Sequence, residues 1–318
     1  MAYDLRPLSL AELLDRSFSL YRRHFWVFVG IMAPPSVAML ILSLGSNLVN
    51  GIQALAPEFQ PGAETGLALA LGVMAVILVA FVFYWISYAL ALGATTSAVS
   101  TIYGGGTPSI SESFGAIRGK LGRLAWLLFL LAVRLGGIVL IVVVASVAAA
   151  AAGGLVTPVF AVLGALSGML VAFGLFIWMF LRYAVCVPAA VLEENTASEA
   201  IARSIDLTAG SLLKVLVLLL FTVVVTYAAL GIFQMPFLIA AAVVGIETPT
   251  GFWLNMLGVV FGSLASALTS PLAVVAVAVL YYDLRIRHEG LDLELMVAKL
   301  KETAASASTQ SPPAALPG

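Results

Sequence analysis

The chain has 318 residues, of which 62% are hydrophobic and 10% are charged, and its formal net charge is -1. Soluble domains carry about 25% charged residues. This composition, with a mean hydropathy of +1.11, therefore excludes a water-soluble fold and predicts an all-α integral membrane protein. The charge balance leaves no basic excess, so no nucleic-acid partner is expected. The single cysteine, Cys186, excludes an internal disulfide or a cysteine metal cluster.

Six apolar segments follow one another along the chain, and each is long enough to cross a bilayer, which takes about 20 residues. They lie within residues 25–49, 66–103, 124–152, 155–187, 212–234 and 252–282. A shorter helix is expected before the first, third and fifth segments, because Ser9, Ser109 and Thr196 each begin the capping-box pattern Ser/Thr-x-x-Glu. Apolar residues recur on one face of these helices. We therefore predict three amphipathic interfacial helices on the cytoplasmic side.

Proline residues interrupt several of these segments. Pro34-Pro35 and Pro271 lie inside the first and sixth spans, where we expect kinks. Pro236 is expected to break the fifth span, and residues 237–246 then form a short apolar segment that is either interfacial or re-entrant. The prolines either mark broken helices around a substrate path or are tolerated kinks.

A repeat divides the predicted membrane domain. Residues 9–20 and 196–207 share the pattern Ser/Thr-x-x-Glu-x-apolar-x-Arg-Ser-apolar-x-Leu, and a looser copy begins at Ser109. The pattern predicts a threefold repeat of one surface helix and two spans, in units of about 7–103, 107–187 and 195–282. Every unit starts on the same side, so the repeats are parallel. The alternative is that capped amphipathic helices before membrane spans resemble one another without common ancestry.

The domain organisation follows from the same pattern. Residues 1–302 are predicted to form a single six-span membrane domain. Residues 303–318 are rich in Ala, Ser and Pro, so we expect a disordered C-terminal tail. The spacings Gly164-x-x-x-Gly168 and Gly258-x-x-x-Gly262 allow close helix approach, which we interpret as packing within the helix bundle rather than as dimerisation.

The basic residues indicate an orientation. Residues 50–65, 153–154 and 235–251, which connect the spans on one side, contain no Lys or Arg. Of the 15 Lys and Arg residues, only Arg134 lies inside an apolar run, and the others flank the spans on the opposite side. Because basic segments stay in the cytoplasm, both termini are predicted to be cytoplasmic.

Arg134 has two interpretations. An ionisable residue inside a span is a candidate functional residue, and no acidic residue lies inside a span to pair with it. Alternatively, residues 135–152 are just long enough to cross the bilayer. Residues 124–133 would then lie at the surface, and the Arg134 side chain would extend to the phosphate groups.

The candidate contacts for lipid headgroups or other anions are all arginines near the cytoplasmic side. They are Arg16, Arg22, Arg23, Arg134, Arg203, Arg285 and Arg287. Arg16 and Arg203 occupy equivalent repeat positions, and the alternative role for both is to keep a helix surface soluble. With only two histidines in the chain, no catalytic set can be assembled, and no cofactor or metal site is expected.

Three stretches carry a family resemblance. They are residues 5–23 (LRPLSLAELLDRSFSLYRR), residues 188–193 with 200–207, and residues 282–293 (YDLRIRHEGLDL). They resemble bacterial multi-span proteins related to the glycerophosphoryl diester phosphodiesterase membrane domain. The resemblance implies a multi-pass protein of the bacterial cytoplasmic (inner) membrane. Some relatives join this domain to a soluble phosphodiesterase domain, but its His-Gly pair and its Glu-x-Asp metal site do not occur in this sequence.

The sequence therefore favours a non-catalytic membrane protein that binds lipid or supports a protein partner at its cytoplasmic face, and no enzyme activity is expected. The alternative is a transporter or permease-like protein with a path lined by proline-broken helices. A path of this kind predicts a water-accessible cavity at the bilayer midplane near Arg134. A scaffold predicts a bundle that is packed shut.

Overall fold

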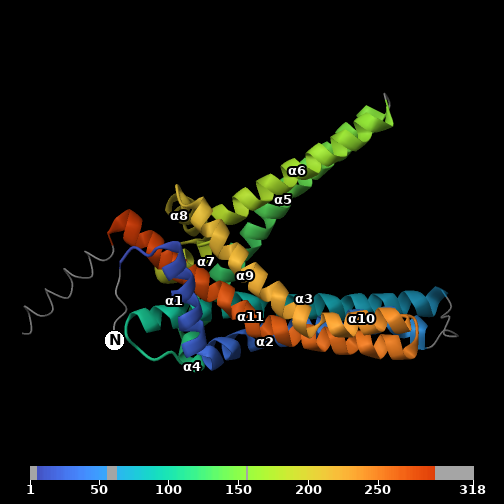
Figure 1. The fold of residues 1–318 in the computed structure, drawn as a ribbon, viewed down its shortest axis with the longest axis horizontal. Coiled ribbons are helices and arrows are strands. Elements are labelled where there is room, and N and C mark those ends of the chain that lie inside the picture. Colours follow the sequence, from blue (N-terminus) through green and yellow to red (C-terminus); the bar gives the residue numbers. More distant parts are fainter. Residues whose placement is uncertain (1–5, 56–62, 155–156, 291–318) are drawn as a thin grey trace, which may run out of the picture.

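The structure is a computed structural model that describes residues 6–55, 63–154 and 157–290 (Figure 1). These residues form helices and no strand. In chain order, the elements are α1 (Leu10–Arg23), α2 (Phe25–Leu55), α3 (Ala63–Tyr103), α4 (Ile110–Ile117), the 3₁₀ turn η1 (Arg118–Lys120), α5 (Leu121–Gly154), α6 (Pro158–Arg182), α7 (Cys186–Leu192), α8 (Ala197–Thr208), α9 (Leu212–Phe233), α10 (Met235–Val244) and α11 (Pro249–Glu289).

Six segments in the described part of the chain are long and apolar enough to cross a membrane. They are centred on α2, α3, α5, α6, α9 and α11. The prediction of a six-span, multi-pass membrane protein is thus confirmed. The two longest helices, α3 and α11, have 41 residues each. At about 1.5 Å per residue each is ~60 Å long, about twice the hydrocarbon thickness of a bilayer, so each extends well beyond the membrane.

Two of the three hairpins pack together. Helices α2, α3, α9, α10 and α11 lie side by side and form what we call the bundle (Figure 1). Within it, α10 packs along α11, with the rings of Phe237 and Phe261 stacked at 4.8 Å between centroids. This short helix was expected to be interfacial or re-entrant, and its position relative to a membrane stays a prediction. In the structure it packs against α11 and follows α9 toward the end of the molecule opposite α1.

The third hairpin stands apart. Helices α5 and α6 pack on each other along their length and diverge from the bundle, and we call them the arm (Figure 1). The only buried residues of α5 are Leu124 and Leu127, near its start. Two glycines of α6 make the close approach possible: a Cβ at Gly168 would overlap the Ser146 side chain, and a Cβ at Gly164 would lie 3.3 Å from the Ala150 backbone. Packing within the protein, which the glycine spacing predicted, is confirmed.

The hydrophobic core lies at one end of the molecule, which we call the hub. There α1, α4, α7 and α8 pack around the starts of α2, α5 and α9 and the ends of α3 and α11. Its largest fully buried side chains are Leu13, Leu20, Phe28, Ile31, Met32, Ile117, Leu124, Leu127, Ile201, Leu207, Leu218 and Tyr281. The buried faces of α1 and α8 therefore contact this protein core.

Helix caps and prolines explain where several elements begin and end. Ser9 and Thr196 form complete capping boxes with the glutamates three residues later, whereas Ser109 makes no side-chain cap hydrogen bond. Pro236 lies at the first turn of α10, so the break predicted in the fifth span is present. The prolines of α2 and α11 lie inside uninterrupted helices.

Two predicted segments take a different form in the structure. The fourth span was expected to end at residue 187, where Pro188 would close it. In the structure α6 ends at Arg182, and Pro188 lies inside the short helix α7. The segment 124–133 was one candidate for a surface helix. In the structure it is the first part of the continuous helix α5 and packs into the hub. The predicted disordered tail, residues 303–318, lies outside the described residues.

Candidate functional site

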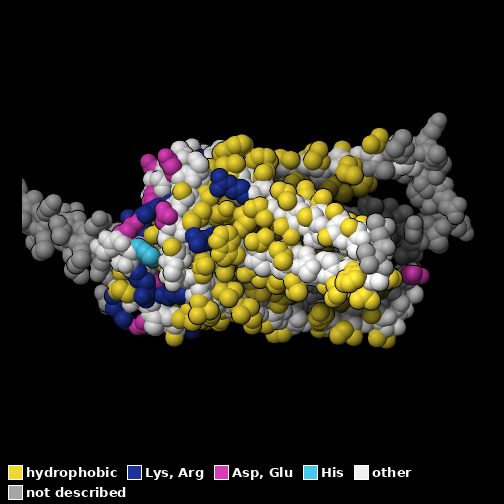
Figure 2. Space-filling view, turned by 90° about the horizontal axis from the view of Figure 1, so that it is seen from above, with side chains coloured by type: hydrophobic (Ala, Val, Ile, Leu, Met, Phe, Trp, Pro, Cys, Tyr) yellow, Lys and Arg dark blue, Asp and Glu magenta, His cyan; other side chains and the backbone are white. Residues whose placement is uncertain are grey.

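Charged side chains gather at the hub end of the molecule. Figure 2 shows Lys and Arg concentrated at that end, apolar side chains over the rest of the visible face, and acidic side chains mostly beside the basic ones. The described connectors at the opposite end, residues 153–154, 157 and 245–248, contain Glu247 and no Lys or Arg. There are therefore two candidate sites: the charged region at the hub, and a cavity among the apolar helices.

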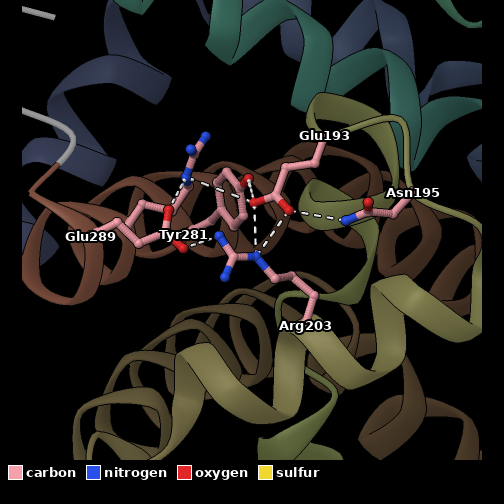
Figure 3. Close-up of polar contacts among 6 residues, drawn as sticks. Glu193, Asn195, Arg203, Tyr281 and Glu289 are labelled. Atoms are coloured by element: carbon pink, nitrogen blue, oxygen red, sulfur yellow. Dashed lines mark hydrogen bonds and ion pairs between the residues drawn. The ribbon is translucent and has the colours of Figure 1, made fainter. Parts of the chain in front are cut away.

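One charged cluster is centred on Glu193, which follows α7 (Figure 3). Its carboxylate accepts hydrogen bonds from the Tyr281 hydroxyl at 2.6 Å, from Arg203 Nε at 2.9 Å and from Asn195 Nδ2 at 2.9 Å. Arg203 comes from α8 and Tyr281 from α11. The cluster therefore fixes the α7–α8 connector, α8 and the end of α11 to one another.

Glu289 completes this cluster at the last residue of α11. Its carboxylate accepts a hydrogen bond from Arg203 and a second one, at 2.9 Å, from Arg285 Nε. Arg285 Nε also lies 3.7 Å from Glu193 Oε1. Two carboxylates and two guanidinium groups thus neutralise each other in a half-buried setting.

A second cluster surrounds Asp283, whose side chain is 0% exposed. Its carboxylate accepts hydrogen bonds from the Leu8 backbone N–H at 2.7 Å, from Lys214 Nζ at 2.5 Å and from Arg287 Nε at 3.0 Å. Lys214 and Arg287 also donate to the Leu8 carbonyl, at 2.8 and 2.5 Å. The segment before α1 is thereby attached to α9 and α11.

A third group of contacts holds the C-terminal end of α7. Arg123 Nη2 donates to the Ala190 carbonyl at 3.0 Å, and Arg123 Nη1 donates to the Glu194 carbonyl at 2.6 Å. Lys120 donates to the Glu194 carboxylate at 2.7 Å. Glu194 has a φ of 58°, in the left-handed region. Cations at a helix C-terminus are favourable, and here they also stabilise this unusual backbone conformation.

The carboxyl group of Glu193 is held in its ionised form. Burial acts to raise the pKa of the Glu193 carboxyl, but the hydrogen bonds from Tyr281 and Arg203 outweigh it, and the pKa lies below its usual value. A carboxylate held in its ionised form in this way is a poor general acid near neutral pH. In the described part of the chain, no group of three His, Cys, Asp or Glu residues is placed to hold a metal ion.

The arginines predicted from the sequence do not converge on one site. Arg203 and Arg285 share the Glu193 cluster, and Arg287 belongs to the Asp283 cluster. Arg16 lies over the Tyr103 ring, 5.4 Å from its centroid. The two equivalent repeat positions therefore contact different groups: Arg16 contacts a ring on α3, and Arg203 contacts the carboxylates of the Glu193 cluster.

The other predicted arginines lie on the surface. Arg22 and Arg23 are exposed at the end of α1, and Arg134 is exposed on α5. None of these three makes a hydrogen bond or an ion pair with another side chain in the described ranges. Their proposed contact with lipid headgroups or anions stays a prediction.

The register of the arm gives the level at which Arg134 lies. Helices α5 and α6 run antiparallel with Ser146 beside Gly168, and this register places Arg134 near Phe180, close to Arg182 at the end of α6. Beyond Arg134, α5 continues to Gly154. That stretch is about 20 residues or ~30 Å long, which matches the hydrocarbon thickness of a bilayer. The register therefore favours a position of Arg134 at the membrane border.

A partly open cavity of about 430 Å³ lies among the bundle helices, and Arg134 does not line it. Its polar lining consists of Ser36, Ser43, Ser46 and Asn47 of α2, Tyr84 and Tyr88 of α3, Gln234 between α9 and α10, and Ser263, Ser266 and Ser270 of α11. The remaining lining residues are Met, Leu, Val, Pro and Gly. The volume is within the usual range for small-molecule sites, about 300–1,000 Å³. The bundle is therefore not packed shut, and every lining side chain is uncharged.

Exposed tryptophans indicate the depth of this cavity. Trp26 is 78% exposed near the start of α2, on the hub side, and Trp253 is 58% exposed near the start of α11, at the opposite end. Exposed tryptophans of membrane proteins gather at the two membrane interfaces. The cavity residues of α2 and α11 lie between these positions, so the cavity lies inside the membrane region of the bundle.

A cavity was predicted only for the transporter alternative, near Arg134 and among proline-broken helices. The observed cavity is lined by Pro35 but not by Arg134, and its polar side chains were not predicted. A signal is nevertheless present. Ser36, Ser43 and Asn47 recur on one face of α2, and Ser263, Ser266 and Ser270 recur on one face of α11. A polar face inside an apolar span is the pattern that indicates an intramembrane site.

One comparison with known proteins gives a match. Residues 159–310 match the family model described as the membrane domain of glycerophosphoryl diester phosphodiesterase. The match runs from α6 through α11 and beyond, and it concerns the membrane domain rather than the catalytic domain. No curated protein and no solved structure matches the chain. The family resemblance seen in the sequence is confirmed over this range.

Proposed function

We propose that this chain is a non-catalytic membrane module that binds a lipid or another amphiphile in the cavity of its bundle. The observation that carries the proposal is the cavity itself, which combines serine, tyrosine and amide groups with apolar walls inside the membrane region. Amphiphiles have the same two parts, and a site of this composition can accommodate both.

The absence of enzyme activity is part of the proposal. At the hub, the carboxylates of Glu193, Asp283 and Glu289 are all occupied by basic or hydroxyl side chains. The cavity lining supplies no general base and no metal ligand set. Binding without chemistry is the function that this distribution of groups supports best.

The proposal extends to orientation. The hub, with its basic residues, is assigned to the cytoplasmic face of the bacterial inner membrane, with α1, α4 and α8 at that interface as the first helices of three parallel repeat units. The matched capping boxes of Ser9 and Thr196 support the repeat. We expect a periplasmic reporter fused after Gly62 to be active and one fused after Gly119 to be inactive. The reverse pattern would overturn the orientation.

A transporter is the second candidate, because α9 ends and α10 begins at Gln234, beside the cavity. The two candidate functions differ in whether water-soluble reagents can reach the cavity from both sides of the membrane. In a variant with Cys186→Ala and Ser266→Cys, a transporter exposes the new thiol to membrane-impermeant reagents from both sides. In a binding module, these reagents do not reach the thiol from both sides.

The experiment that tests the binding function is mass spectrometry of small molecules and lipids that survive mild purification. We expect one class to be enriched over the bulk membrane in the wild type and lost in Ser266→Phe, because the new ring fills the cavity. Ser167→Phe, which changes an exposed serine of the arm, is the matched control and keeps the enrichment. A wild-type profile equal to the bulk membrane would refute binding, and the search would turn to protein partners at the hub.

A further inference from the structure

The cavity also indicates the chemical class of its ligand. Resting on the proposed function, we infer that it binds an uncharged amphiphile whose head carries hydroxyl groups, and that Gln234 determines this preference. Three features support the inference: the neutrality of the lining, the chemistry of its polar groups and the position of Gln234.

The lining is neutral throughout. None of the residues around the cavity is Asp, Glu, Lys, Arg or His. Moving an ion into a low-dielectric site without a partner is strongly unfavourable. A phosphate, carboxylate or ammonium head would find no opposite charge there, so the cavity selects against charged heads.

The polar groups that line the cavity both donate and accept hydrogen bonds. Serine hydroxyls, tyrosine hydroxyls and the glutamine amide all have this property. Some are already used within α2: the Ser36 hydroxyl donates to the Met32 carbonyl at 2.8 Å, and the Ser46 hydroxyl donates to the Ser43 carbonyl at 3.0 Å. On α11, the hydroxyls of Ser263 and Ser266 make no hydrogen bond to any other described residue. Such groups match the hydroxyls of a ligand, which also donate and accept.

Gln234, at the α9–α10 break, is one of two side-chain amides in the cavity lining among the described residues. The other is Asn47 of α2, whose Nδ2 donates to the Ser43 carbonyl at 2.8 Å. The backbone N–H of Gln234 donates to the Leu230 carbonyl at 2.8 Å, which ends α9. Its side chain lies against Gly262 of α11, where a Cβ would come within 2.5 Å of Oε1 and 2.7 Å of Cδ. The missing side chain at position 262 therefore allows this amide to occupy its place in the cavity wall.

The inference can be tested with a photoactivatable probe. Dodecane-1,2-diol with a diazirine in its chain is added to the full chain in phosphatidylcholine nanodiscs, and labelled peptides are identified by mass spectrometry. Unlabelled dodecane-1,2-diol, dodecane and dodecanoate then compete, because they share a chain length and differ only in the head. We expect labels on peptides that line the cavity, and competition by the diol at about tenfold lower concentration than by dodecane or dodecanoate.

Two variants test the role of Gln234. Gln234→Met keeps the approximate volume of the side chain and removes the amide, and Gly262→Ala displaces the amide. In both, we expect the advantage of the diol over dodecane to fall about threefold to tenfold, as for the loss of one hydrogen bond. Ser167→Ala on the arm is the control and leaves the advantage unchanged.

The outcomes separate the two proposals. If dodecanoate competes as well as the diol, or if Gln234→Met keeps the full advantage, the ligand class is wrong while binding in the cavity stands. If no probe labels the peptides that line the cavity, the proposed binding function itself fails. A variant that does not fold is recognised by the loss of its monodisperse elution, and the competitor series in the wild type then decides the ligand class.

Discussion

The bundle and the arm are both built from long apolar helices, yet they differ in what their side chains contact. In the bundle, α2, α3, α9 and α11 surround a cavity lined by serine, tyrosine and amide groups. In the arm, α5 and α6 contact mainly each other, through Gly164 and Gly168, and most of their large apolar side chains are exposed. The bundle thus contains the features of a binding site, and the arm presents an apolar surface suited to lipid.

The same contrast continues at the hub, where each part is attached differently. The bundle end is held by the buried charge cluster of Asp283 and by the cluster of Glu193. The arm end is held by Leu124 and Leu127 in the core and by Arg123 at the end of α7. Four sets of variants test how the attachment of the bundle differs from that of the arm.

The largest effect is expected for Asp283→Ala. The change leaves Lys214 and Arg287 without their carboxylate in a buried setting, and removing one partner of a buried charge pair costs about 3–5 kcal/mol. The free energy of unfolding in detergent micelles measures the loss. Glu247→Ala, an exposed acidic residue at the opposite end, is the control. A loss below about 1 kcal/mol, the level of a surface ion pair, would show that the cluster is solvated.

A second prediction concerns Gly168→Leu. The new side chain overlaps Ser146, and overpacking of this kind costs about 1–3 kcal/mol. Hydrogen exchange should increase in α5 and α6 and stay unchanged in α2 and α11. Gly174→Leu, with no neighbouring atom within 4 Å of the added Cβ, should change neither region. Faster exchange in the bundle would show that the arm and the bundle are coupled.

The third prediction uses the pKa of Glu193, which lies below its usual value in the folded chain. A lowered carboxyl pKa stabilises the folded state above the unfolded pKa, and this contribution is lost as the pH falls through the folded pKa. The difference in Tm between the wild type and Glu193→Gln should therefore be largest near neutral pH and shrink below about pH 4.3, the usual Glu value. A difference that is constant with pH would contradict the ionised role of Glu193.

The smallest effects are expected at the helix caps. Ser9→Ala and Thr196→Ala should each cost about 1 kcal/mol, because both side chains accept a hydrogen bond from the helix N-terminus. Ser109→Ala, at the start of the arm's unit, should cost little, because Ser109 makes no such bond. Equal losses of stability at all three positions would show that the cap of Ser109 is as strong as those of Ser9 and Thr196. Thermal unfolding of the three variants in parallel provides the comparison.

Much of the fold follows from local pattern. The apolar runs identify the six spans because crossing a bilayer requires that length and composition, and Pro236 predicts the break between α9 and α10 because it cannot donate to the preceding turn. Helix α7 was missed, since Pro188 was interpreted as a stop although a proline is compatible with the first turn of a helix. The separation of the arm from the bundle depends on contacts between distant helices, which no local pattern specifies.

The candidate sites were less predictable for a related reason. Glu193 and Tyr281 are 88 residues apart and meet only in the fold. The sequence therefore predicted Arg285 and Arg287 as candidate lipid or anion contacts and did not predict their acidic partners. In the cavity, the serines of α11 carry no charge and were therefore not considered. Neutral polar side chains reveal a site only when the faces of several helices are known.

The length of the arm has a consequence for the membrane that surrounds it. Between Arg134 and Gly154, α5 offers an apolar length of about 30 Å, close to an average bilayer. A bilayer of another thickness causes hydrophobic mismatch, to which a helix pair responds by tilting. The bundle helices are restrained by one another, whereas the arm can tilt about its attachment at the hub. We therefore expect the arm, rather than the bundle that holds the cavity, to adjust to bilayer thickness.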